Sequence, residues 1–149
     1  MTTVEIRDVK GFVGKLLASD TFDDFLILAA VITKANTFTI DGRLNEEYLS
    51  DLENEDQSDG GDKTLVGKLQ TWGNVRSFCF ELIQGKTLPV YMKVVLQKSG
   101  EEADHYLNIV YDRKELKVVT GTSLRTFTLD KSIEREWDKS AENLLKEFT

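Results

Sequence analysis

Residues 105–130 have the sequence HYLNIVYDRKELKVVTGTSLRTFTLD, in which three short runs are rich in Val, Ile, Tyr, Phe and Thr. The runs are HYLNIVYD, KELKVVTGT and RTFTLD, and short links of turn-forming residues separate them. Consecutive antiparallel strands typically have this composition and spacing. Residues 105–130 therefore predict a three-stranded meander.

A helix is expected directly after the meander, with Asp130 as its N-cap. Apolar residues then recur at the spacing of one helical face. They are Ile133, Trp137, Ala141, Leu144, Leu145 and Phe148. A meander closed by a helix is a packing arrangement, so it indicates a fold without indicating a chemistry.

Three further strands are predicted earlier in the chain. Residues 25–33, FLILAAVIT, form a continuous apolar run that favours a central strand buried on both faces of a sheet. Residues 36–41, NTFTID, alternate apolar and polar side chains and are expected to form a hairpin with that strand. Residues 90–98, VYMKVVLQK, follow the only proline and provide the third.

Two further helices are predicted from helical spacing of apolar residues. The first covers residues 6–17 with Asp8 as N-cap, and the second covers residues 75–83 between Asn74 as N-cap and Gly85 as the stop. Together the elements predict an α+β fold. We expect a mainly antiparallel sheet of about six strands with helices packed on it, and the C-terminal helix closing the domain.

The length and composition predict one domain, residues 1–149. The longest apolar run, residues 25–32, is far shorter than the ~20 residues of a membrane helix, and the N-terminus MTTVEIRDVK has no apolar signal region. A single cysteine excludes an internal disulfide and fits a reducing compartment. We predict a cytoplasmic protein that needs neither a membrane nor a cofactor.

The acidic charge is concentrated in one segment. Residues 44–62 hold eight acidic side chains and no Lys or Arg, so the net charge of −7 leaves the rest of the chain at +1. The segment is also poor in apolar residues after Leu52, which predicts an acidic, flexible loop at about residues 51–63. Its charge either attracts a basic partner surface or simply keeps a surface loop solvated.

No assembled catalytic set is evident, and we assign no catalytic residue. His105 is the only histidine, which excludes multi-histidine metal sites and most triads, and we expect it to be exposed. Cys79 lies on the apolar face of the second predicted helix and is expected to be a buried small hydrophobe. The nucleotide-binding pattern G-x-G-x-x-G does not occur.

Two sets of carboxylates are candidate sites. Asp41, Asp112 and Asp130 each follow a predicted strand and would form one site if the strand ends converge, although turn and capping roles also explain each of them. The acidic segment also allows a weak divalent-cation site, formed by Asp56, Asp59 and Asp62.

Three stretches carry a resemblance to a known family. They are FDDFLILAAVITKANTFTIDGRLNEEY, WGNVRSFCFELIQGKTLPVYMKVVL and LNIVYD…VTGTSLRTFTLDKSIEREWD, of which TFTIDG and TGTS…FTLDK…WD are the most specific parts. The chain resembles a family of small domains of unknown function from Firmicutes, especially Clostridia-type bacteria. The resemblance implies an intracellular protein of a bacterium or a bacterial mobile element. It implies no activity, catalytic residue or cofactor.

The leading hypothesis is a non-enzymatic protein-binding module. In its sharpest form it is a small acidic, anti-CRISPR-like inhibitor from a phage or mobile element, whose carboxylates replace phosphates in a basic nucleic-acid-binding surface of a partner protein. Direct binding to nucleic acid is disfavoured by the same charge. The predicted partner-binding residues are Glu53, Glu55, Asp56, Asp59 and Asp62.

Two alternatives stay open at this point. One is a carboxylate-based, metal-assisted enzyme that uses Asp41, Asp112 and Asp130. The other is a structural subunit that forms a homodimer through an exposed strand edge of the meander.

Overall fold

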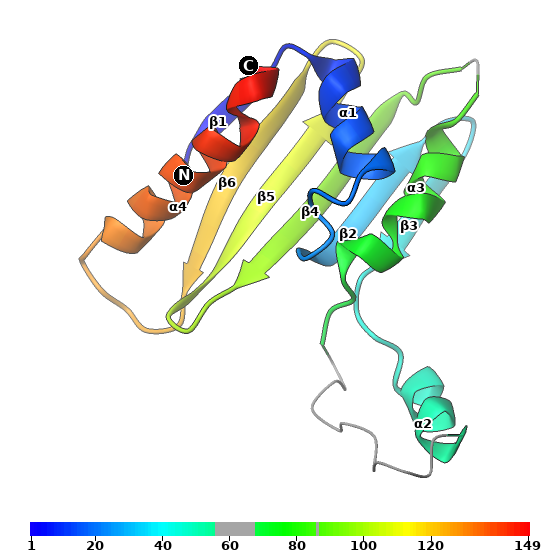
Figure 1. The fold of residues 1–149 in the computed structure, drawn as a ribbon, viewed down its shortest axis with the longest axis horizontal. Coiled ribbons are helices and arrows are strands. Elements are labelled where there is room, and N and C mark those ends of the chain that lie inside the picture. The colour runs from blue at the N-terminus through cyan, green and yellow to red at the C-terminus, as the bar shows by residue number, and fades with distance from the viewer. Residues whose placement is uncertain (56–67, 86) are drawn as a thin grey trace.

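The computed structural model describes residues 1–55, 68–85 and 87–149, and its centre is one six-stranded sheet (Figure 1). All strand pairs are antiparallel, and the strand order is β1-β6-β5-β4-β2-β3. The strands are β1 Thr3–Ile6, β2 Leu26–Thr33, β3 Thr37–Asp41, β4 Tyr91–Ser99, β5 Ala103–Tyr111 and β6 Leu116–Leu124.

Three of the helices cover one face of this sheet, as Figure 1 shows, and a fourth, α2, stands apart from it. The α-helices are α1 Val9–Ala18, α2 Glu46–Glu55, α3 Arg76–Ile83 and α4 Ser132–Leu145, with short 3-10 turns η2 Trp72–Asn74 and η3 Lys146–Phe148. The molecule is therefore an antiparallel sheet with a helical layer on one side. The predicted α+β fold with a closing C-terminal helix is confirmed.

The core lies between the helical layer and the sheet. Phe12 of α1 packs edge-on against Phe148 of η3, with ring centroids 5.4 Å apart. Trp72 is fully buried, and its indole Nε1 donates a hydrogen bond of 2.9 Å to the carbonyl of Leu16. These contacts fix α1 against both the C-terminal end and the turn before α3, so segments distant in sequence close one core.

Strand β2 is buried on one face only, and the prediction of two buried faces is wrong. Ile27, Ala30 and Ile32 are buried beneath the helices, whereas Ala29 and Val31 on the other face are partly exposed. The described helices leave that face of the sheet uncovered. Apolar composition alone could not reveal this, because Ala and Val tolerate partial exposure at little cost.

The sixth strand is β1, and the predicted strand at residues 125–130 does not form. Residues 125–131 are an irregular connection in which Phe127 is 91% and Leu129 is 84% exposed. Strand β1 occupies the outer edge of β6, pairing Val4 with Val118. RTFTLD makes no strand pairing despite its favourable composition, because composition alone does not decide whether a segment joins a sheet.

Several helix boundaries also differ from the predictions. Ile6 belongs to β1, so α1 begins after it, although Asp8 is the N-cap as expected and accepts from the Gly11 amide at 3.0 Å. Asn74 lies in η2 and does not cap α3, which begins at Arg76. Gly85 follows α3 with a φ of 123°, as expected of a glycine stop.

Candidate functional site

The two ends of the acidic segment are hydrogen-bonded to each other where they join the body of the protein. The Leu44 amide donates to the Lys68 carbonyl at 2.7 Å, and the Gln70 amide donates to the Gly42 carbonyl at 2.8 Å. Arg43 and Leu69 form an antiparallel bridge between these bonds. The two ends of the segment are therefore paired like the strands of a hairpin. We call residues 45–67, which connect the two ends in the sequence, the acidic excursion.

The first half of the excursion is helix α2, where the sequence had predicted a loop from residue 51. Asn45 starts the helix, because its side-chain oxygen accepts from the Tyr48 amide at 3.0 Å. Glu46 and Glu47 occupy the first turn, where carboxylates stabilise the positive end of a helix. The remainder of the predicted acidic loop, residues 56–63, lies outside the described residues.

The first part of helix α2, up to Asp51, presents carboxylates to solvent. Glu46, Glu47 and Asp51 are exposed, and the Tyr48 ring between them is 63% exposed. The helix sequence EEYLSDLENE contains five acidic residues and no basic one. Figure 1 shows it projecting from the domain beyond the lower ends of β2 and α3.

Only some of the predicted partner-binding residues fall within the described chain. Glu53 and Glu55 lie in α2, whereas Asp56, Asp59 and Asp62 lie outside the described residues. The exposed acids Glu46, Glu47 and Asp51 are not among the predicted partner-binding residues. The signal for them was present in the sequence as an Asn N-cap followed by Glu-Glu, the start of an acidic helix.

Asp41, Asp112 and Asp130 do not form one site. Asp41 is on edge strand β3, three strands from β5, which corresponds to about 14 Å across the sheet. Asp112 follows the end of β5 that pairs with the start of β6, whereas Asp130 follows the other end of β6. These two ends of the β5–β6 pair are eight residues apart, which corresponds to about 27 Å along the strands. The carboxylate-enzyme interpretation therefore loses its geometric basis.

Each of the three carboxylates has a local structural role. Hydrogen bonds from Arg43 lower the pKa of Asp41 to about 2. Asp112 accepts from the amides of Glu115 and Lys114 in the β5–β6 turn, and these bonds lower its pKa. Asp130 accepts from the Ser132 amide at 2.9 Å, and this bond lowers its pKa. Helix α4 starts at Ser132 with Lys131 at the N-cap position, so the prediction of Asp130 as N-cap is wrong by one residue.

His105 is partly buried, and the prediction of an exposed histidine is wrong. Its ring stacks on Trp137 of α4 with centroids 5.0 Å apart, and its Nδ1 lies 3.2 Å from Thr122 Oγ1. Burial lowers its pKa. The histidine therefore packs in the interface between α4 and the sheet, where partial burial favours the neutral imidazole over the charged one.

Cys79 is fully buried on α3, as predicted, and burial raises the pKa of its thiol to about 11. A thiol in that state is a poor nucleophile at neutral pH. In the part of the chain that the structure describes, no three His, Cys, Asp or Glu side chains are placed to hold a metal ion. Within the same residues, no helix is long and apolar enough to cross a membrane.

Comparison with known proteins supplies a family. Residues 15–106 and 103–149 match a family of unknown function, DUF5721. The chain belongs to DUF5721. The matched stretches include five of the six strands and all of α4, so the resemblance to a family of unknown function is confirmed. Neither the curated proteins nor the solved structures contain a match. Membership in DUF5721 assigns no activity to the protein.

Proposed function

We propose that this protein is a non-enzymatic binding module that places its acidic segment, beginning with α2, in a basic surface of a partner protein. The observation that carries the proposal is the exposed row of Glu46, Glu47 and Asp51 on a helix that projects from a nearly neutral body. The proposed partner is a nucleic-acid-binding protein, since its Arg and Lys side chains are arranged for regularly spaced anions.

The chemistry of α2 supports this type of recognition. Carboxylates can accept paired hydrogen bonds from Arg, and a concentrated charge also accelerates encounter with an oppositely charged surface. Tyr48 adds an exposed aromatic ring among the carboxylates, the kind of side chain that anchors protein interfaces. The predicted residues Glu53, Glu55, Asp56, Asp59 and Asp62 would extend the same acidic surface along the chain.

The proposal includes a cellular setting. We propose that the protein acts in the cytoplasm of a Firmicutes-type bacterium. There, as an acidic inhibitor carried by a phage or mobile element, it would meet nucleic-acid-handling enzymes. The single cysteine, which is buried and free, is compatible with a reducing compartment.

The first experiment removes the segment without removing the body. Residues 45–67 are replaced by Asn-Gly, which joins the paired residues Leu44 and Lys68 through a two-residue hairpin turn. Wild type and this variant are used to capture proteins from a bacterial lysate, and the captured proteins are identified by mass spectrometry. We expect wild type alone to capture a nucleic-acid-binding protein, and added DNA to compete. Equal capture by both proteins would rule out the acidic segment as the interface.

A second experiment tests charge directly once the partner is purified. Glu46→Gln, Glu47→Gln and Asp51→Asn together should weaken binding at least tenfold and flatten its dependence on salt. The matched control neutralises three exposed carboxylates of the body, at Glu101, Glu102 and Glu136, and should leave affinity and salt dependence unchanged.

A further inference from the structure

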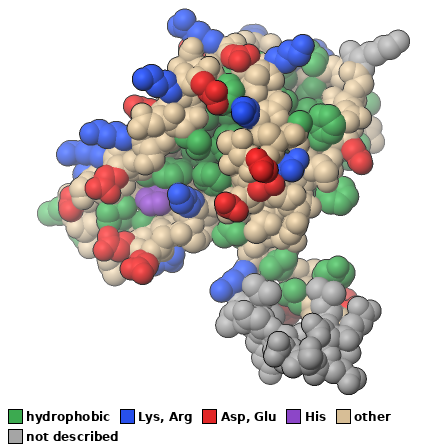
Figure 2. Space-filling view, viewed as in Figure 1, with side chains coloured by type: hydrophobic (Ala, Val, Ile, Leu, Met, Phe, Trp, Pro, Cys, Tyr) green, Lys and Arg blue, Asp and Glu red, His purple; other side chains and the backbone are tan. Residues whose placement is uncertain are grey.

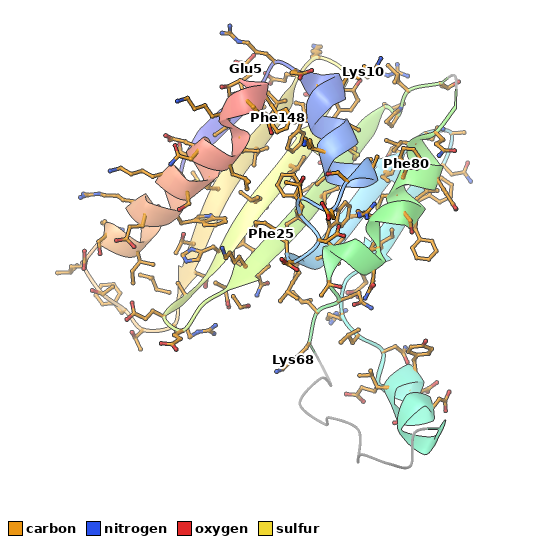
Figure 3. All side chains as sticks on the ribbon, viewed as in Figure 1. Glu5, Lys10, Phe25, Lys68, Phe80 and Phe148 are labelled. Atoms are coloured by element: carbon orange, nitrogen blue, oxygen red, sulfur yellow. The ribbon has the colours of Figure 1, made fainter. Side chains whose placement is uncertain are left out.

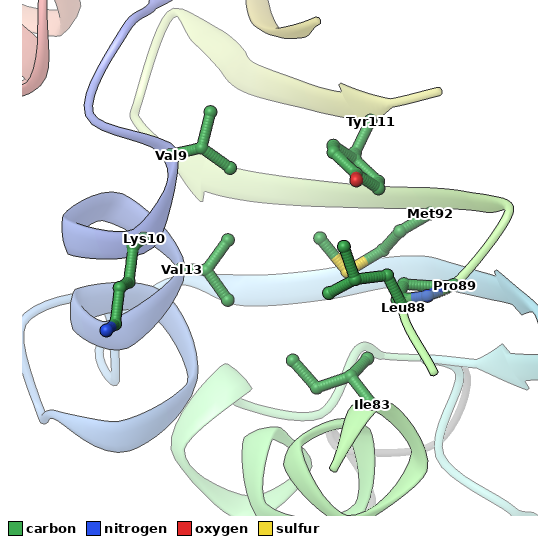
Figure 4. Close-up of a pocket in the computed structure, with 8 residues that line it drawn as sticks. All are labelled: Val9, Lys10, Val13, Ile83, Leu88, Pro89, Met92 and Tyr111. Carbon is green, nitrogen blue, oxygen red and sulfur yellow. The ribbon is translucent and has the colours of Figure 1, made fainter. Parts of the chain in front are cut away.

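A second feature lies on the body, away from the acidic segment: an apolar pocket between α1, the end of α3 and the start of β4. Its volume is about 450 Å³, within the range of small-molecule sites. Figure 4 shows the side chains that line it. Six of them are apolar: Val9, Val13, Ile83, Leu88, Pro89 and Met92. We call this hollow the α1–α3 pocket.

The walls of the α1–α3 pocket expose apolar surface that a ligand could cover. In Figure 4 the side chains of Val9 and Val13 point from α1 towards those of Leu88 and Met92, across an open space. Leu88 is 66% exposed, although it is a large apolar side chain. Figure 2 shows hydrophobic side chains reaching the surface at the upper right of the molecule, where Figure 1 places the ends of α1 and α3. Binding of a ligand that covers such a surface is favourable, because it removes apolar surface from water.

The polar groups at the pocket define the chemistry of the ligand. Only Lys10 and Tyr111 contribute polar side-chain atoms to the lining, and both can donate hydrogen bonds. Among the described residues, no carboxylate lines the pocket. Lys10 is exposed, and in Figure 4 its side chain points away from the open space, so its ammonium group has to rotate about the side-chain bonds to reach a bound anion. An apolar chain that ends in an anion matches this arrangement.

We propose that the α1–α3 pocket binds an aliphatic carboxylate, a medium-chain acyl ligand. The chain packs against Val13, Ile83 and Met92, and the carboxylate accepts from Lys10 and Tyr111 at the edge of the pocket. This site is separate from the acidic segment, and its occupancy does not depend on a protein partner.

The test measures binding of hexanoate, octanoate and decanoate to the full-length protein by isothermal titration calorimetry. Affinity should tighten about fourfold for each added methylene until the chain fills the pocket. Decanol and decyltrimethylammonium have the same chain with a neutral and a cationic head, and each should bind at least tenfold more weakly than decanoate. Equal affinity for the three heads would overturn the carboxylate assignment, and no saturable binding of any chain at millimolar concentration would overturn the site.

Variants locate the binding. Val13→Phe adds a ring inside the pocket and should weaken decanoate binding at least tenfold while leaving the unfolding midpoint unchanged or higher. Lys10→Gln should remove the preference for decanoate over decanol, and Lys15→Gln, an exposed lysine of the same helix that does not line the pocket, should retain it. Unchanged decanoate binding by Val13→Phe would place the ligand elsewhere.

The outcome is separable from that of the proposed function. The variant that lacks residues 45–67 should bind decanoate as tightly as wild type, because none of the deleted residues lines the pocket. Tyr111→Phe keeps the ring and removes only the hydroxyl, so it should weaken decanoate binding about two- to tenfold without unfolding the protein. A variant that fails to fold is recognised by its lost cooperative unfolding, and the conservative Tyr111→Phe then decides the result.

Discussion

A single buried hydroxyl connects three elements of the structure. Thr120 of β6 is fully buried, and its Oγ1 donates a 2.6 Å hydrogen bond to Asp138 Oδ1 of α4. The same oxygen accepts from the Thr2 amide at 2.8 Å, next to β1. The residue therefore joins the edge strand, the sheet and the C-terminal helix through one atom.

Thr120→Val should lower the free energy of unfolding by about 1–3 kcal/mol. Valine fills nearly the same space, so the loss comes from leaving the Asp138 carboxylate and the Thr2 amide without their partner. Urea denaturation measures the change. Thr39→Val on exposed edge strand β3 is the control and should change stability by less than about 0.5 kcal/mol. A loss for Thr120→Val no larger than that of the control would show that the hydroxyl does not stabilise the fold.

Cys79 makes stability depend on alkaline pH. Its thiol has a pKa of about 11 in the folded protein, against an ordinary value near 9. The unfolded chain therefore releases the proton first as the pH rises, so the stabilisation is complete below about pH 9 and is lost between pH 9 and 11. The free energy of unfolding should fall by about 2 kcal/mol more in wild type than in Cys79→Ala over this range. Parallel pH profiles for the two proteins would contradict the buried-thiol account.

At the scale of one element, α1 contains two glycines in different surroundings. Gly14 has open space where a Cβ would lie, whereas a Cβ on Gly11 would overlap the Asp8 carboxylate that caps the helix. Gly14→Ala should therefore raise the free energy of unfolding by about 1 kcal/mol, the difference in helix propensity. Gly11→Ala should lose that gain because the cap must move, which costs about 1 kcal/mol.

Thermal and urea unfolding measure how the same glycine-to-alanine substitution changes stability at two positions of α1, Gly11 and Gly14. Equal stabilisation by both would mean that the Asp8 cap relaxes freely. The Gly14 variant also serves as a background for the ligand titrations, since Gly14 does not line the α1–α3 pocket.

At the scale of the whole molecule, the body should fold without the acidic excursion. Replacing residues 45–67 by Asn-Gly keeps the Leu44–Lys68 and Gly42–Gln70 hydrogen bonds and removes no described core residue. Each halving of loop length recovers about 0.6 kcal/mol of closure entropy, and this change is more than three halvings. The free energy of unfolding should stay equal or rise by up to about 2 kcal/mol, measured by circular dichroism. Loss of cooperative unfolding would show that the segment is part of the folded core.

The amino-acid sequence alone determined most of the local elements of this DUF5721 protein, with β1 and α2 as the exceptions. Residues with alternating or continuous β-branched and aromatic side chains became β2 to β6, and apolar residues at helical spacing became α1, α3 and α4. The pattern of one buried face is a local property, since each element must hide its own apolar side chains. The buried Cys79 followed from the same pattern.

The tertiary structure decided which of these local tendencies could be satisfied. RTFTLD has strand composition, yet it makes no pairing in the sheet, since strand formation depends on the tertiary surroundings more than on composition. His105 is partly covered by Trp137, a residue far along the chain. Strand order separates Asp41 from Asp112, and the direction of β6 separates Asp112 from Asp130. The α1–α3 pocket exists only where three distant segments meet. Strand order and contacts between distant residues are set by competition among all the elements at once, so no single stretch of sequence contains them.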